Sequence, residues 1–406
     1  MRTPGFTRDL LRPAGGDEAH RVTFVELFFD LVFVFAVTQI SHHLIASPSL
    51  LGLVQTIMLT MAIWWVWVDT AWVTNWLNPE QPRVRALLIV LMLGALLMSS
   101  AIPEAFAYKG VQFTVSLVAI QLARGVFTVL AFARHRADNA MNFARITAWA
   151  AASGVFWIVG GFAQPEARLW LWLIALAIDF SGPVARFYVP GFAASETRTW
   201  NVSGEHMAER VSLFAIIALG ESIVVTGATF GQLPLSWQSL LAFLAAFAGT
   251  VLMWLIYFNH AQRSGTEHIV RSSDAGAVAR VAYTYIPVVL VIGIVLAAVG
   301  DALVLESPSG RVAAWAALVI AGSAVLYIAA NVLFVRSIGG PWLAGHLSAI
   351  VVLLLLALLA LFTPALSALA LSWLSNVVLL LVVIADELLF RRKRHRSTAV
   401  EAMSTD

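Results

Sequence analysis

Residues 22–44 read VTFVELFFDLVFVFAVTQISHHL, an apolar run long enough to cross a bilayer as a helix. Glu26 and Asp30 interrupt this run four residues apart, so they lie one turn from each other on one helical face. A charge inside a membrane helix costs a few kcal/mol, and such residues normally face the protein interior and serve a function. The stretch therefore predicts a membrane helix with a polar face turned toward other helices.

The composition is that of a polytopic membrane protein. Of the 406 residues, 60% are hydrophobic and 12% are charged, which is about half the charged share of a soluble domain. The chain has no cysteine, and this excludes disulfides, thiolate metal sites and thiol catalysis. Lys109 and Lys393 are the only lysines, and both lie outside the apolar runs. Chemistry that needs a buried lysine is therefore excluded as well.

Twelve apolar segments are predicted to be transmembrane helices. They cover about residues 22–45, 50–76, 83–104, 111–134, 142–163, 168–188, 207–230, 236–262, 277–302, 311–336, 342–362 and 366–390. The predicted fold class is an all-α polytopic membrane protein. Most arginines fall in loops on one side of these helices, and the other side holds Lys109, Arg168 and Arg311. By the positive-inside rule, both termini are expected in the cytoplasm.

Short matches between the two halves of the chain predict an internal repeat. Pro103-Glu104-Ala105 matches Gly300-Asp301-Ala302, and Ala177-Ile-Asp179 matches Ile384-Ala-Asp386, with an offset that rises along the chain. The predicted parts are a cytoplasmic arm (1–21), a first six-helix repeat (22–189), a cytoplasmic linker (190–206), a second six-helix repeat (207–390) and a basic, disordered cytoplasmic tail (391–406). Repeats of six helices share one orientation in the membrane.

Several predicted helices carry ionisable residues. The candidates for ion coupling are Glu26, Asp30, Asp69, Arg124, Asp179 and Glu221, and the secondary candidates are Ser222, Asp386, His42 and His43. Acids outnumber the arginines predicted to be buried, so some acids must be protonated, solvated by a cavity or bound to cations, as in coupled transport. The structural alternative is that Arg124, the one arginine placed well inside, pairs with Asp30 or Asp69 to hold the helices together.

Other kinds of site find little support in the sequence. His42 and His43 close the first helix at the outer face, where they could titrate or bind a metal. Glu205, His206 and Glu209 bring a histidine near carboxylates in the linker, but without the HExxH pattern of a zinc enzyme. The chain has no nucleotide fingerprint, nucleophile elbow or phosphate loop. No catalytic residue, metal, cofactor or nucleic acid is therefore predicted.

Two stretches resemble the bacterial low temperature requirement A (LtrA) membrane proteins. They are residues 22–44 and ERVSLFAIIALGESIVV at 209–225. The resemblance extends from about Val22 to Arg391, and its matched positions are Glu26, Phe28, Phe29, Asp30, Gly220, Glu221 and Ser222. It implies an integral protein of the bacterial cytoplasmic (inner) membrane, from a family named for a growth defect in the cold, and no specific activity. A fainter similarity to endolysosomal potassium channels rests on the six-helix repeats and on Phe28-Phe29-Asp30, and the second half has Leu219-Gly220-Glu221 at the corresponding place instead of the channel motif.

Three functions are open at this point. The favoured one is a secondary transporter or ion-conducting protein that uses intramembrane carboxylates for proton or cation coupling. The others are a membrane-embedded enzyme or maintenance protein acting on lipid or isoprenoid substrates, and a structural or signalling scaffold. The expected partners are the lipid bilayer, protons or monovalent cations, and a small substrate. The identity of the substrate and the oligomeric state are left open.

Overall fold

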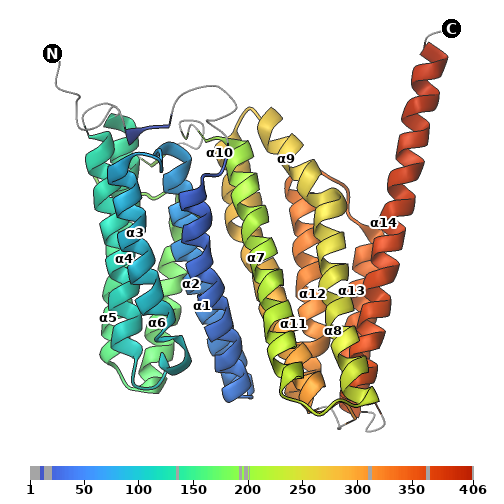
Figure 1. Cartoon of the computed structure of the whole chain (residues 1–406). Helices are drawn as coiled ribbons and strands as arrows, with labels where there is room; N and C mark the ends of the chain where they lie inside the picture. Colours follow the sequence, from blue (N-terminus) through green and yellow to red (C-terminus); the bar gives the residue numbers. More distant parts are fainter. Residues whose placement is uncertain are drawn as a thin grey trace. The chain divides into compact units, whose positions relative to one another are not determined.

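The computed structural model describes residues 10–12, 21–133, 137–191, 194–195, 200, 202–309, 313–362 and 366–404. These residues form helices joined by short connections, and they contain no strand (Figure 1). Within this described part, 12 helical stretches are long and apolar enough to cross a membrane. The structure thus confirms the predicted all-α fold with about 12 membrane helices.

Each predicted helix has a counterpart in the structure. The first elements are α1 (Phe24–Ala46), α2 (Leu50–Trp76), α3 (Pro82–Ser99), η3 (Ile102–Glu104), α4 (Gly110–Phe132), α5 (Ala137–Phe162) and α6 (Pro165–Val184). They are followed by α7 (Gly204–Gly231), α8 (Trp237–Ile256), η5 (Tyr257–Ala261), α9 (Gln262–Arg271), α10 (Ala275–Arg280), η6 (Val281–Tyr285), α11 (Ile286–Glu306), α12 (Ala314–Ser337), α13 (Ala344–Phe362) and α14 (Ala368–Ser404). The segments η5 and η6 are π-helical and join their neighbours into longer rods.

The chain divides into two compact units. Unit 1 comprises Met1–Glu221 and Thr266–Val288, and unit 2 comprises Ser222–Gly265 and Val289–Asp406. The division falls inside α7 and assigns α10 and η6 to unit 1. These limits differ from the halves expected from the sequence matches, so the internal repeat remains a prediction.

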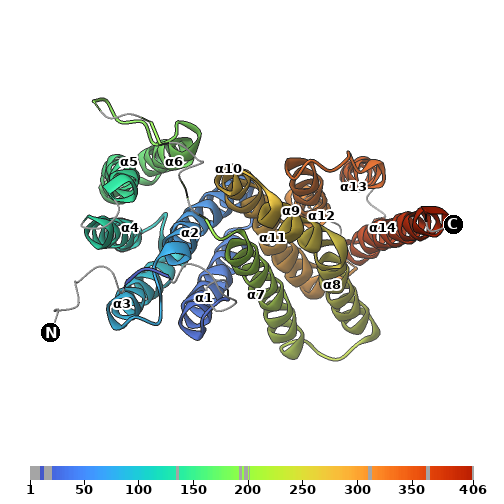
Figure 2. The same cartoon turned by 90° about the horizontal axis from the view of Figure 1, so that it is seen from above.

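Unit 1 is built from neighbouring helices that pack in chain order. α3 packs on α4, α4 on α5 and α5 on α6, while α1 contacts both α2 and α3, as seen from above in Figure 2. Its interior is rich in tryptophan, and Trp64, Trp67, Trp157 and Trp172 are each no more than 1% exposed. Such large side chains fill the space between helices, and each ring nitrogen needs a partner when buried. The polar sites described below supply several of those partners.

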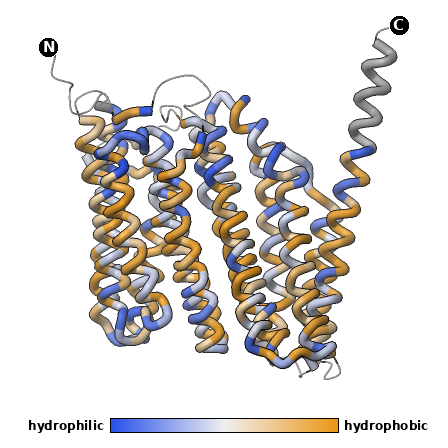
Figure 3. The backbone as a smooth tube through the Cα atoms, in the orientation of Figure 1, coloured by the Kyte–Doolittle hydropathy of each residue, from blue (hydrophilic) through white to orange (hydrophobic). Residues whose placement is uncertain are grey.

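Unit 2 packs α12 against α13 and α14, and α14 against α8. α13 is the least covered of the apolar helices, and its exposed leucines include Leu354, Leu355, Leu358 and Leu359. In a water-soluble protein such a face would need a partner, whereas in a membrane protein lipid covers it. Apolar residues run along the helices of each unit, and polar residues are more frequent toward the helix ends (Figure 3).

The sequence predicts a disordered tail from residue 391, and the structure differs at this point. α14 instead continues as one helix to Ser404. The physical reason is that Ala368–Ser404 contains neither glycine nor proline, so no residue in it breaks the helix. Because Arg391, Lys393 and their neighbours are good helix formers, charge alone does not end the helix.

Arg168 is the second difference from the sequence expectation, which places it in an outer loop. It lies in the first turn of α6 and is 6% exposed. Its guanidinium donates to five backbone carbonyls, those of Ala105, Ala107, Gly160, Gly161 and Ala163, at 2.6–3.2 Å. All five donors of an arginine are thereby satisfied without a carboxylate. The segment before α4 and the end of α5 are thus held to α6 at one point.

We expect Arg168→Lys to lower the free energy of unfolding by about 3 kcal/mol, because an ammonium has three donors and cannot reach carbonyls arranged for a planar fork. Thermal unfolding of the full chain in detergent measures the effect. Arg85→Lys is the matched control, since Arg85 pairs with Glu80 at an exposed site, where such a pair contributes little. Equal unfolding temperatures for the two variants would contradict the proposed anchoring role.

Candidate functional site

Glu26 lies at the N-terminus of α1 and not near the middle of a membrane helix. Thr23 is the N-cap, and the two residues form a capping box in which each side chain accepts from the other's backbone N–H. The free N–H groups and the helix dipole at this end favour a carboxylate. Burying the charge of Glu26 here therefore costs less free energy than burying it in the middle of an apolar helix.

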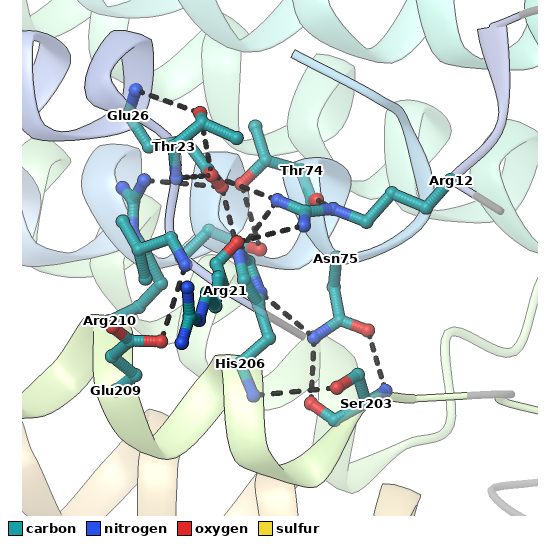
Figure 4. Close-up of polar contacts among 12 residues, drawn as sticks. Arg12, Arg21, Thr23, Glu26, Thr74, Asn75, Ser203, His206, Glu209 and Arg210 are labelled. Carbon is teal, nitrogen blue, oxygen red and sulfur yellow. Dashed lines mark hydrogen bonds and ion pairs between the residues drawn. The ribbon is translucent and has the colours of Figure 1, made fainter. Parts of the chain in front are cut away.

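Three basic side chains surround the fully buried Glu26 carboxylate (Figure 4). Arg12 Nη2 lies 2.8 Å from Oε2, and His206 Nε2 and Arg210 Nη1 lie 2.9 Å and 3.4 Å from Oε1. Arg12 comes from the N-terminal arm, where its backbone N–H donates to Trp76 O at 2.8 Å. The arm, α1 and α7 thus meet at this one carboxylate.

Asn75 connects His206 to the segment that precedes α7. The Asn75 carbonyl accepts from the Ser203 backbone N–H at 2.8 Å, and its amide group donates to Ser203 O at 2.9 Å. The same amide nitrogen lies 3.2 Å from His206 Nδ1. On the other side of the ring, His206 Nε2 lies 2.9 Å from both Glu26 Oε1 and Arg12 Nη2.

Asp30, one turn further along α1, pairs with Arg210. Arg210 Nη2 lies 2.7 Å from Asp30 Oδ1, and both side chains are fully buried. Trp67 Nε1 donates to the same oxygen at 2.7 Å, and the Arg210 guanidinium lies 5.5 Å from the centre of the Trp67 ring. Glu26 and Asp30 are thus compensated by two arginines, Arg12 and Arg210.

This arrangement corrects the charge balance expected from the sequence, which counts Arg12 and Arg210 with the arginines of the cytoplasmic side and not with the buried ones. Arg124 is not the one arginine placed well inside, because Arg210 is 0% exposed and Arg168 is 6% exposed. The spacing of His206 and Arg210 on α7 is four residues, the same as that of the two acids on α1. Matching i,i+4 pairs on two helices were the signal in the sequence that could have revealed the contact.

Asp69 and Arg124 form a second ion pair, one of the two that the structural alternative named. Arg124 Nη2 lies 2.9 Å from Asp69 Oδ2, and Nη1 donates to Val66 O and Thr70 Oγ1 at 2.9 Å and 3.0 Å. The Arg124 side chain is 4% exposed, whereas that of Asp69 is 19% exposed. Its hydrogen bonds therefore fix the arginine of the pair, whereas the carboxylate of Asp69 is partly accessible from outside.

A cavity within unit 1 explains this accessibility. Its volume is about 820 Å³, the open space at its mouth included. Aromatic side chains form much of its wall, and its polar lining residues include Gln121, Asn139, Asn142, Arg280 and Thr284 beside the ion pair. Mostly apolar walls with a few polar groups are the usual composition of a small-molecule site.

Two features of the cavity wall are typical of a ligand-binding site. The carbonyl oxygen of Gln121 is buried without a hydrogen-bond partner among the described residues, and Gln121 precedes Arg124 by one turn of α4. Thr284 lies in the π-helical η6, where Trp72 Nε1 donates to its hydroxyl at 2.9 Å and Trp64 Nε1 to its carbonyl at 2.8 Å. Irregular turns of this kind are frequent at functional sites.

Asp179 and Glu221 occupy separate positions in unit 1. Trp157 Nε1 donates to Asp179 Oδ2 at 3.0 Å, and the Ser153 hydroxyl also donates to this carboxylate. Glu221 is 2% exposed, and its carboxylate forms a hydrogen bond with the Thr38 side chain. Its Oε1 has no hydrogen-bond partner among the described residues. Glu26 and Asp30 thus belong to one ion-paired cluster and Asp69 and Arg124 to another, and the Asp179 carboxylate interacts electrostatically with this second pair.

The secondary candidates are dispersed. His42 is exposed, and His43 is buried, with its ring nitrogens 3.1 Å from Pro103 O and 3.2 Å from Gln55 Oε1. In unit 2, Asp386 Oδ2 lies 3.5 Å from His346 Nε2, and the Ser222 hydroxyl lies 3.3 Å from that of Thr250. Across the described residues, no three His, Cys, Asp or Glu side chains converge on a point where they could hold a metal ion.

Comparison with known proteins identifies relatives of this chain. A model of the family described as bacterial low temperature requirement A protein (LtrA) matches residues 21–384. A protein of Rhizobium meliloti (strain 1021), with the name uncharacterized protein RA0937, is 40% identical over 302 residues, which are 73% of each chain. No solved structure matches. Both signature stretches found in the sequence lie inside the matched region.

Proposed function

Because the chain belongs to the LtrA family of integral membrane proteins, we propose that it is a secondary transporter of the bacterial cytoplasmic membrane with both termini in the cytoplasm. The solute binds in the unit 1 cavity and contacts the Asp69–Arg124 pair. The observation that carries this proposal is the accessible ion pair on the wall of a cavity of about 820 Å³ within a bundle of membrane helices.

The cavity indicates the class of solute. The rings of Trp72, Trp76 and Phe143 offer flat apolar surface to a solute. Arg124 would bind a carboxylate of the solute, Asp69 an amino group, and the free oxygen of Gln121 a further donor. A solute with an apolar body and one or two ionised groups meets all of these partners.

The ion pair also supplies a means of coupling. A carboxylate of the solute that binds Arg124 competes with Asp69 for the guanidinium. A carboxylate that loses its counter-ion inside a protein must take up a proton or another cation, because an unpaired buried charge is costly. Solute binding and cation uptake are thereby linked at one residue. Glu26 and Asp30, by contrast, are closed off by Arg12 and Arg210, and a structural role fits them better.

Proteoliposomes test this proposal with a mixture of candidate solutes. Vesicles that hold the purified protein are placed in a uniformly ¹³C-labelled bacterial metabolite extract under an imposed proton or sodium gradient, and their contents are analysed by mass spectrometry. We expect one or more labelled metabolites to accumulate in a gradient-dependent way. Asp69→Asn should reduce that accumulation by roughly a hundredfold, because it removes the coupling carboxylate.

Glu166→Gln is the control variant, since Glu166 is an exposed carboxylate in the first turn of α6 and lies outside the cavity. It should accumulate the same metabolites as the wild type. Identical contents in wild-type and protein-free vesicles under both gradients would refute the transporter proposal. Unchanged accumulation in Asp69→Asn would exclude Asp69 from coupling.

A further inference from the structure

Unit 2 contains a smaller pocket that the proposed function does not use. It has a volume of about 380 Å³, the open space at its mouth included, and lies among α8, α11, α12 and α14. Its wall is partly apolar, with alanine, glycine and larger aliphatic side chains. The polar lining residues all carry side-chain oxygen atoms, and they are Thr250, Asp301, Ser323, Ser372, Ser375 and Asn376.

Three hydroxyl groups of this pocket are acceptors. Thr250 donates to Ala246 O at 3.2 Å, Ser323 to Ile320 O at 2.8 Å, and Ser375 to Leu371 O at 2.9 Å. Each hydroxyl has one hydrogen and two lone pairs. Because its hydrogen is bonded to a carbonyl of its own helix, each of these oxygens has only lone pairs left to offer a ligand.

Asn376 adds an oxygen of the same kind. Its amide nitrogen donates to Ala245 O at 2.7 Å, which leaves the side-chain carbonyl as the free group. That oxygen lies close to Gly249, where an added Cβ would be 3.0 Å from it. A larger residue at position 249 would therefore crowd the oxygen, and the glycine keeps the approach to it open.

Asp301 on α11 is the charged member of the pocket. The Ser222 hydroxyl, from the second part of α7, donates to its carboxylate. None of the described residues that line the pocket is basic, and Asp301 forms no ion pair with any arginine, lysine or histidine of the described chain. A carboxylate with this surrounding of lone pairs creates a strongly negative potential inside a membrane protein.

We propose that this pocket binds one alkali metal cation, with the carboxylate of Asp301 as the charged ligand and the oxygens of Thr250, Ser323, Ser375 and Asn376 as candidate neutral ligands. Hard cations prefer oxygen ligands of these types. One carboxylate balances one positive charge, so a monovalent ion leaves the site neutral, whereas a divalent ion would leave a net charge buried. Binding stands on these contacts alone, and a role of the cation in driving transport would rest on the proposed function.

Thermal unfolding of the full-length protein in detergent tests the binding step. It is measured at one pH and one ionic strength in lithium, sodium, potassium or choline chloride. We expect at least one alkali salt to raise the unfolding temperature by roughly 5 °C over choline, with saturation as its concentration rises. Asp301→Asn should abolish the difference between salts. Glu306→Gln is the matched control, because Glu306 is an exposed carboxylate on the same helix.

A second variant keeps the test decisive if Asp301→Asn does not fold. Thr250→Val removes one candidate oxygen without changing the charge or the shape of the site, and it should raise the half-saturating salt concentration roughly tenfold. Equal unfolding temperatures in all four salts would overturn the proposal, as would an alkali effect that survives Asp301→Asn. A dependence on pH through Asp301 without any alkali effect would also overturn it, in favour of a proton carrier. The experiment contains no solute, so failure here is distinct from failure of the transport proposal.

Discussion

Arg210→Met should lower the free energy of unfolding by about 3–5 kcal/mol, which is a large share of the stability of a typical protein. The variant leaves Asp30 without its guanidinium partner at 2.7 Å and removes one of the basic groups around Glu26. Both carboxylates are fully buried, so water cannot replace the lost partner. The measurement is the unfolding temperature and the yield of folded protein by size-exclusion chromatography in detergent.

The double variant Asp30→Asn/Arg210→Met distinguishes a lost ion pair from lost packing. It removes both charges of the pair, and we expect it to recover most of the stability that Arg210→Met loses, because the cost comes mainly from the uncompensated carboxylate. Arg271→Met is a control on an exposed arginine of the same unit. A double variant that unfolds as readily as Arg210→Met would show that the guanidinium matters for its shape and not for its charge.

The sequence contains most of the information needed to predict the helices. Each membrane helix is a local feature, because about 20 apolar residues in a row determine it, and α1, α2 and α4 begin and end within about two residues of the predicted limits. Prediction and structure differ where the apolar run and the helix differ. α14 continues past its apolar part to Ser404, and the π-helical η5 carries α8 on into the polar α9. Hydropathy marks the part of a helix that lipid covers and not the end of the helix.

The partners of buried charges could not be predicted in the same way. Arg210 and Asp30 are 180 residues apart in the chain, and nothing local in either segment identifies the other. Arg210 lies near the start of α7 beside polar residues, so the sequence places it at the cytoplasmic end of a helix and not among the buried charges. Asp301 stands out in the sequence only as a marker of an internal repeat, since its hydroxyl surroundings come from other helices. Acids are visible in a sequence, but the groups that neutralise them depend on the tertiary fold.

The Asp69–Arg124 pair gives a sharper test of transport than either residue alone. Arg124→Gln should destabilise the protein, because it leaves Asp69 without its counter-ion at 2.9 Å. In Asp69→Asn/Arg124→Gln, two amides replace the two charges and can still hydrogen-bond to each other and to Thr70. We expect this double variant to unfold within a few degrees of the wild type. Its metabolite accumulation in proteoliposomes should nevertheless fall by roughly a hundredfold, since neither a solute-binding charge nor a coupling carboxylate remains.

This combination of results would separate the functions that the sequence left open. A scaffold needs the pair only for stability, so restoring stability would restore its function. A transporter needs the charges themselves, so a stable double variant would remain inactive. If the double variant folds and accumulates metabolites like the wild type, Asp69 and Arg124 serve only to join α2 to α4, and the cavity beside them is not the solute site. If it folds and is inactive, the ion pair is part of the transport pathway, because its one remaining difference from the wild type is the loss of the two charges.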